Sequence, residues 1–89
     1  MLDRIRETRF RSKDDSYLSI LEISEEDFFD VYDRTDAEVA REIVADYLLE
    51  REDDGRPNNI EIKHDKVNKI ISIQYGLSYV GNDHTDYDS

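Results

Sequence analysis

Carboxylate side chains recur at four-residue intervals in the middle of the chain, and this spacing is the clearest chemical pattern in the sequence. The series consists of Glu38, Glu42, Asp46, Glu50 and Asp54. On an α-helix, residues four apart lie on one face, about 6 Å from each other along the axis. A second acidic series at three-residue intervals precedes it and consists of Asp27, Asp30 and Asp33. If both segments are helical, the two series extend one negative field.

Two interpretations of this carboxylate pattern remain open. Like charges four residues apart destabilise an isolated helix by about 0.2 to 0.5 kcal/mol per pair, so a purely structural helix more often alternates Glu with Lys. The pattern is typical of a solvated acidic helix face, which is common on protein surfaces. It also fits a surface that imitates the regularly spaced phosphates of a nucleic acid and so occupies a groove that binds DNA or RNA.

Residues for catalysis are scarce. The sequence has no cysteine and only two histidines, His64 and His84, which we expect to be ordinary exposed side chains at a hairpin turn and in the C-terminal tail. No glycine-flanked serine is available as an activated nucleophile, and the three glycines are too scattered to form a phosphate-binding loop. We therefore predict that the protein is not an enzyme and holds no cofactor.

An incomplete calcium-loop pattern overlaps the end of the acidic series. Loop positions one, three, five, six and twelve would be Glu50, Glu52, Asp54, Gly55 and Glu61. The first ligand of such a loop is normally Asp, and a helix should follow the loop where this sequence is strand-like. We interpret the segment as a helix end followed by a turn, and predict no metal site.

Charge is unevenly distributed along the 89 residues, which carry 23 acidic and 12 basic side chains for a formal net charge of −11. Residues 1–13 form a basic arm with five cations and two anions, whereas residues 14–54 hold sixteen anions and three cations. Such a field opposes direct binding to nucleic acid or to an anionic membrane, because both depend on Lys and Arg to neutralise phosphates. A basic partner is the expected counterpart.

Length and composition predict one small domain in a reducing compartment. Hydrophobic residues make up 37% and charged residues 39% of the chain, and about 100 to 150 residues is the usual size of one domain. We expect a folded unit over residues 1–80 and a flexible acidic tail over 81–89. The absence of cysteine, of an apolar run of about 18 residues and of a signal-peptide pattern favours the cytoplasm.

Helix signals lie in the acidic middle segment. Ser24 followed by three acidic residues predicts a short helix over residues 25–33. Thr35 and Glu38 form a capping box that predicts a long helix over residues 36–52, ended by the glycine and proline that follow. The aromatic residues of the short helix fit core packing better than an exposed anchor for a partner; they are Phe28, Phe29 and Tyr32.

Strand patterns flank the helices. Residues 17–23 alternate with apolar side chains on both faces, which indicates a central or well-covered strand, whereas residues 7–12 leave strand and helix open. A hairpin is expected after residue 59, with a turn near residues 64–68 and one apolar face formed by Ile71, Ile73, Tyr75, Leu77 and Tyr79. The predicted fold is α+β: a mainly antiparallel sheet of three or four strands, packed by one face on one long and one short helix, its other face partly open.

Small size, absence of cysteine and segregated acidity together resemble, in general character, the acidic inhibitors of phages and mobile elements and the small immunity proteins that neutralise nuclease toxins. The likeness is compositional and assigns no residue. It favours a stoichiometric inhibitor or decoy of the nucleic-acid-mimic type, whose two acidic series bind a basic, nucleic-acid-handling protein. The alternative is a structural or regulatory adaptor with a solvated acidic surface.

Overall fold

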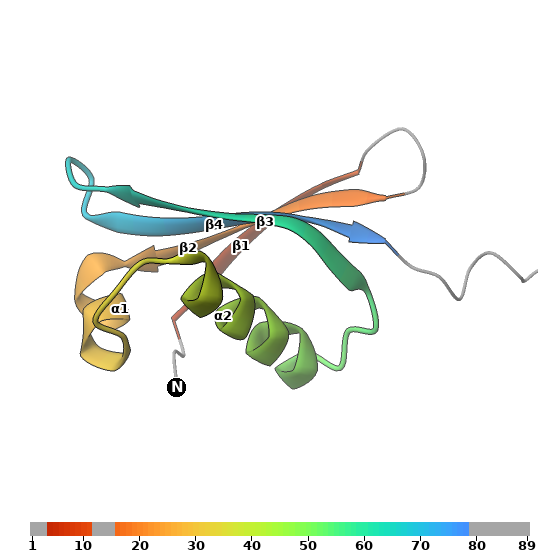
Figure 1. Ribbon diagram of the computed structural model, residues 1–89. Coiled ribbons are helices and arrows are strands. Elements are labelled where there is room, and N and C mark those ends of the chain that lie inside the picture. The colour runs from red at the N-terminus through yellow and green to blue at the C-terminus, as the bar shows by residue number, and fades with distance from the viewer. Residues whose placement is uncertain (1–3, 12–15, 79–89) are drawn as a thin grey trace, which may run out of the picture.

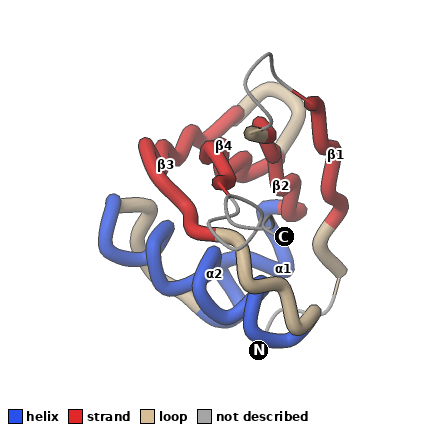
Figure 2. Tube along the Cα trace, turned by 90° about the vertical axis from the view of Figure 1, so that its right-hand side faces the viewer, coloured by secondary structure: helices blue, strands red, loops and turns tan. Residues whose placement is uncertain are grey.

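The fold is a four-stranded antiparallel sheet with two helices on one of its faces, as the sequence predicted. The computed structural model describes residues 4–11 and 16–78, so the predicted tail, Tyr79 and His84 lie outside the described residues. The elements in chain order are β1 (Arg6–Arg11), β2 (Tyr17–Ser24), α1 (Glu25–Val31), α2 (Ala37–Glu50), β3 (Arg56–Asp65) and β4 (Ile70–Ser78). The strand order is β1-β2-β4-β3, and both helices pack beneath the sheet (Figures 1 and 2).

The two central strands supply most of the inner sheet face. In their antiparallel register, β2 residues Ser19, Leu21 and Ile23 lie opposite Tyr75, Ile73 and Ile71 of β4. All six of these side chains are at most 1% exposed, and they pack with Phe28 of α1 and the inward stripe of α2. The predicted hairpin face and the central position of β2 are therefore confirmed. Residues 6–11, which the sequence left open, form an edge strand beside β2.

The short helix ends two residues earlier than expected. Ser24 caps α1 by accepting a hydrogen bond from the backbone N–H of Asp27 at 3.1 Å. Tyr32 then adopts extended backbone angles, which turn its ring back to within 5.5 Å of the buried Phe28 ring. Phe29, in contrast, is 43% exposed, so the prediction that all three aromatic residues pack in the core was wrong for this one.

The long helix is capped one residue later than the Thr-x-x-Glu pattern suggested. The side chain of Asp36, not that of Thr35, accepts a hydrogen bond from the N–H of Val39 at 3.0 Å. Both Asp and Thr are good N-cap residues. The cap therefore shifts by one position, and Glu38 lies in the first turn, where the positive end of the helix dipole favours an acidic side chain.

The same helix ends at Glu50 instead of residue 52. Backbone N–H groups of Glu52 and Asp53 donate to the carbonyls of Leu49 and Leu48 at 3.1 and 2.8 Å, which is the pattern of a Schellman motif. Glu52 occupies the left-handed position of this motif, with φ of 55°. Gly55 and Pro57 therefore do not end the helix; Gly55 precedes β3 and Pro57 is its second residue.

The β3–β4 hairpin turns one to two residues later than predicted, because Asp65 organises the turn. One carboxylate oxygen of Asp65 accepts hydrogen bonds from the N–H groups of Val67 and Asn68, both at 3.1 Å. His64 therefore remains in β3. A register shift between Asn58 and Glu61 interrupts the pairing of β3 with β4, which identifies a β-bulge in this edge strand.

No described element covers the second face of the sheet, called the open face below. Its apolar side chains are the half-buried Leu18, Ile20 and Ile70 and the 51% exposed Phe10. The sequence pattern of β2, apolar on both sides, is explained by this arrangement: one side packs on the helices and the other contributes to the open face (Figure 1).

Candidate functional site: an acidic helix face and the network beside it

The outer face of α2 presents four of the predicted carboxylates to solvent. Five residues on the inward side of this helix are at most 5% exposed; they are Val39, Ala40, Ile43, Val44 and Leu48. Packing of this stripe on the sheet fixes the rotation of the helix, because an amphipathic helix buries its apolar face. The opposite side is therefore solvated, and it carries Glu38, Glu42, Asp46 and Glu50, called the acidic row below.

Most of the charge on the acidic row is uncompensated. Glu38 forms an exposed ion pair with Arg34 at 3.5 Å, and such exposed pairs contribute little to stability. Within the described residues, the other three members form no ion pair. Glu42 and Asp46 lie close enough to Tyr32 that, with burial as the largest cause, their charges raise the pKa of that phenol. The row therefore acts as a block of negative charge available to a partner.

The remaining predicted partner-binding residues do not continue this row. Asp54 lies beyond the Schellman motif and is not on the helix, and Asp33 follows the end of α1. Asp27 is half-buried and is 3.6 Å from the guanidinium of Arg4, whereas Asp30 is exposed on α1. The structure therefore brings four of the eight predicted residues onto one helix face.

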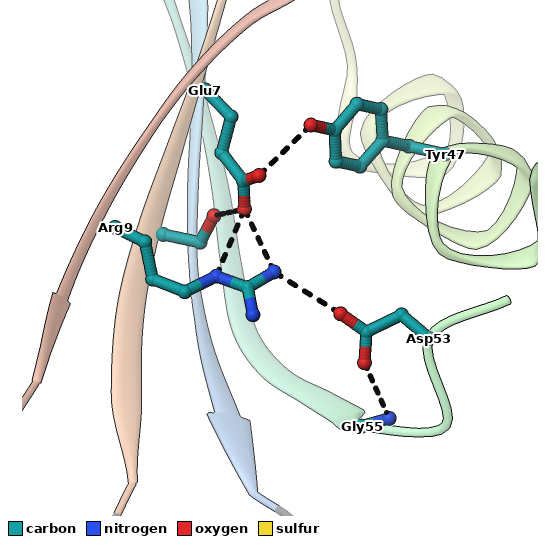
Figure 3. A network of polar contacts seen from close by, with 6 residues as sticks. Glu7, Arg9, Tyr47, Asp53 and Gly55 are labelled. Carbon is teal, nitrogen blue, oxygen red and sulfur yellow. Dashed lines mark hydrogen bonds and ion pairs between the residues drawn. The ribbon is translucent and has the colours of Figure 1, made fainter. Parts of the chain in front are cut away.

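A partly buried polar network lies next to the end of α2 and was not predicted from the sequence (Figure 3). Glu7 of β1 is its centre: one carboxylate oxygen accepts from Arg9 at 2.8 and 3.0 Å and from the Ser19 hydroxyl at 2.7 Å. Its other oxygen accepts from the hydroxyl of Tyr47 in α2 at 2.9 Å. Arg9 also donates to Asp53 at 3.1 Å. The edge strand is thereby connected to both α2 and the α2–β3 loop.

The network keeps Glu7 ionised. Burial alone would raise its pKa, but hydrogen bonds from Ser19, Tyr47 and Arg9 outweigh burial and hold the pKa of Glu7 below its usual value. The hydrogen bond from Tyr47 to Glu7 shifts the pKa of the phenol in the opposite direction. Burial, together with the hydrogen bond and the charge of Glu7, raises the pKa of Tyr47 to about 12. At neutral pH the pair is therefore a carboxylate that accepts from a neutral phenol.

A groove of about 520 Å³ opens beside the network, between β1 and the loop after α2. Its lining residues are Glu7, Arg9, Arg51, Glu52, Asp53 and Asp54. Arg9 and Asp53 are paired with each other, whereas the side chains of Glu52 and Asp54 are exposed. The groove therefore adds negative charge just past the end of the acidic row.

Sequence reasoning missed this network because its members are far apart in the chain. Glu7 and Tyr47 are 40 residues apart, and Arg9 and Asp53 are 44 apart. The one available signal was Glu7 and Arg9 at a two-residue spacing, which places them on the same face if the segment is a strand. The sequence indicated a basic arm within the domain but gave no partners for its cations; in the structure Arg9 of this arm pairs with Glu7 and Asp53.

His64 also departs from the prediction of an ordinary exposed side chain. Its Nε2 is 2.5 Å from a carboxylate oxygen of Glu25, the first residue of α1, and its side chain is only 22% exposed. The ring of Phe29 lies 5.5 Å away, centroid to centroid. The imidazole therefore connects the edge strand β3 with the start of α1.

Residues 4–11 and 16–78 contain neither a metal-binding cluster nor a membrane-spanning helix. No group of three or more Asp, Glu or His side chains there is arranged to hold a metal ion. Neither helix in this part of the chain is long and apolar enough to cross a membrane. Comparison of the chain with protein-family models, curated proteins and solved structures gave no match.

Proposed function

We propose that this protein is a non-catalytic binding protein whose acidic row occupies a basic, nucleic-acid-binding groove of another protein. The observation that carries the proposal is the exposure of four carboxylates on one face of α2, of which only Glu38 forms an ion pair in the described part of the chain. Solubility alone does not require a row of one sign, because surfaces with interspersed charges of both signs are also soluble. A row of one sign favours a partner of the opposite sign by steering and by charge complementarity.

The geometry suits an elongated groove better than a small pocket. Twelve residues separate the first and last members of the row, which at 1.5 Å per residue is a length of about 18 Å. The row lies on a rigid element, since the opposite side of α2 is packed in the core. Rigid presentation lowers the entropy lost on binding. Such a row would engage several Lys or Arg side chains at once along a groove.

The first experiment uses the wild-type protein as bait in an extract of its native cells and then compares two variants. One neutralises part of the row by Glu42→Gln and Asp46→Asn; the matched control neutralises two exposed acids elsewhere by Glu26→Gln and Glu61→Gln. Both variants change net charge equally. We expect capture of the partner to fall at least tenfold for the row variant only, and to weaken as salt rises, because exposed charges are screened beyond about 8 to 10 Å at 0.1 to 0.15 M salt.

Competition with nucleic acid separates this proposal from a simple acidic adaptor. Duplex DNA added to the captured complex should displace the partner if the row occupies its nucleic-acid groove. The purified protein alone should not retard the same DNA at about 0.15 M salt, because its negative charge repels phosphate. Equal capture by both variants, or a complex that DNA does not displace, would contradict the nucleic-acid-mimic mechanism.

A further inference from the structure

The open face of the sheet is a second surface whose chemistry differs from that of the helical layer. Phe10 of β1 lies directly opposite Leu18 of β2, and Leu18 lies opposite Gly76 of β4. At Gly76 an added Cβ would be only 2.6 Å from the side-chain oxygen of Asn58, so no larger residue fits there without displacing that side chain. Phe10, Leu18 and Ile20 form an apolar strip across β1 and β2. The strip ends at Gly76 of β4, over which the amide of Asn58 lies.

Charges on the open face balance, unlike those of the helical layer. The strand registers place three cations and three anions on this face: Arg6, Arg56 and Lys63, and Glu22, Glu61 and Asp65. The α1–α2 segment, residues 25–50, holds ten anions and only two cations. A basic partner is therefore drawn to the helical layer, whereas the open face suits a surface that is itself near neutral and apolar.

Neither edge of the sheet is suited to pairing with another strand. In β1, four of six residues are charged, and three of these are arginines. In β3, a proline at the second position and the register shift between Asn58 and Glu61 interrupt the row of backbone donors and acceptors. Charged residues, proline and bulges are the usual means by which edge strands avoid association. Association of this sheet is therefore directed to its face.

We propose that a second copy of this chain covers the open face, forming a sheet-on-sheet homodimer. The four strands β1 to β4 are 6, 8, 10 and 9 residues long. At about 4.8 Å between strands and about 3.3 Å per residue, the face measures roughly 19 by 27 Å, a flat area of about 500 Å². Standard interfaces bury about 800 Å² per partner, so the face suits a small interface and a weak dimer. Packing the neutral faces together also places the two acidic helical layers on opposite outer surfaces, where their mutual repulsion is smallest.

Sedimentation equilibrium or light scattering of the full chain tests this proposal. Each chain is 10.6 kDa, so a dimer has twice that mass. Ile20→Lys puts a charge in the middle of the face, and Phe10→Ser removes the 51% exposed ring with little risk to the fold. We expect each variant to raise the dimer dissociation constant at least tenfold. Leu49→Lys, at a 78% exposed position on α2, is the matched control and should leave the mass unchanged.

Salt separates this contact from the one proposed for the acidic row. Raising salt should weaken the binding of a basic partner, because salt screens the attraction between opposite charges. The dimer should stay intact or become more stable, because salt does not screen apolar contacts but does screen the repulsion between the two negative chains. A monomeric wild-type protein at about 100 µM overturns the dimer, as does a Phe10→Ser variant that dimerises like the wild type. Either result removes the open face as a dimer surface and leaves the proposal for the acidic row unaffected.

Discussion

Replacing Glu7 with Gln tests whether the polar network around this carboxylate stabilises the fold. The substitution keeps the shape of the side chain, but it removes the negative charge and converts one acceptor oxygen into a donor. Three of the four hydrogen bonds to Glu7 end on one oxygen, from Arg9 twice and from Ser19, and the fourth comes from Tyr47. No neutral amide can reproduce this set of contacts.

The expected loss follows from the difference between charged and neutral hydrogen bonds. A hydrogen bond to a charged group contributes about 1.5 to 3 kcal/mol and a neutral one about 0.5 to 1.5 kcal/mol. The Glu7 side chain is 13% exposed and that of Arg9 is 28% exposed, so solvent screens this pair only in part. Loss of charge assistance in two to three bonds should lower the free energy of unfolding by about 2 to 3 kcal/mol.

Urea denaturation at neutral pH measures this loss, with Glu61→Gln as the matched control. Glu61 also lies in an edge strand but is exposed on the open face, so its substitution should change stability by less than about 0.5 kcal/mol. Equal losses of stability for the two substitutions would refute the reasoning, because they would show that the hydrogen bonds of Glu7 stabilise the fold no more than a solvated carboxylate does.

Acid provides a second test of the same network. Because the folded state lowers the pKa of Glu7, the stabilisation is fully present above the unfolded pKa and is lost as pH falls through the folded value. The difference between wild type and Glu7→Gln should therefore persist from neutral pH to about pH 5 and shrink toward about pH 3. A difference that stays constant over this range would assign the effect to shape, not to charge.

The other predictions concern the helix ends, the core and the tyrosines. Asp36→Ala should lower stability by about 0.5 to 2 kcal/mol in urea denaturation, and Thr35→Ala by clearly less, since Asp36 is the N-cap. Ile43→Ala should lower the free energy of unfolding by about 2 to 5 kcal/mol, because it leaves a cavity under α2. Glu52→Gly should raise the free energy of unfolding by about 1 kcal/mol and so raise the melting temperature, because Glu52 has a φ of 55°. Alkaline titration monitored by tyrosine absorbance should show a group that ionises near pH 12 and is absent in Tyr47→Phe. Because folding raises the pKa of Tyr47, this residue stabilises the fold below about pH 10, and the stabilisation is lost as pH rises further.

The sequence predicted the helices and strands whose signals are local. It did not predict the features that depend on contacts between residues far apart in the chain. Residues 71–77 alternate in the sequence and are alternately buried in the structure, because strand burial has a period of two. The end of α2 depends instead on Glu52 adopting a left-handed conformation that favours glycine, so no local rule placed it there. The acidic row follows from helical spacing alone, whereas Glu7 became recognisable only when the fold brought α2 to the edge strand.

The strand order has a consequence for how the chain folds during synthesis. The partners in the β2–β4 ladder are 46 to 60 residues apart in the sequence, from Ser24 with Ile70 to Tyr17 with Leu77. Until Ile70–Ser78 has left the ribosome, the apolar inner side of β2 has no central neighbour, and α2 has only part of the surface on which it packs. Pairings of such long range form slowly and leave apolar strands exposed to other nascent chains. The concentration of negative charge in residues 14–54, which flank and follow that strand, would keep these emerging chains apart by repulsion.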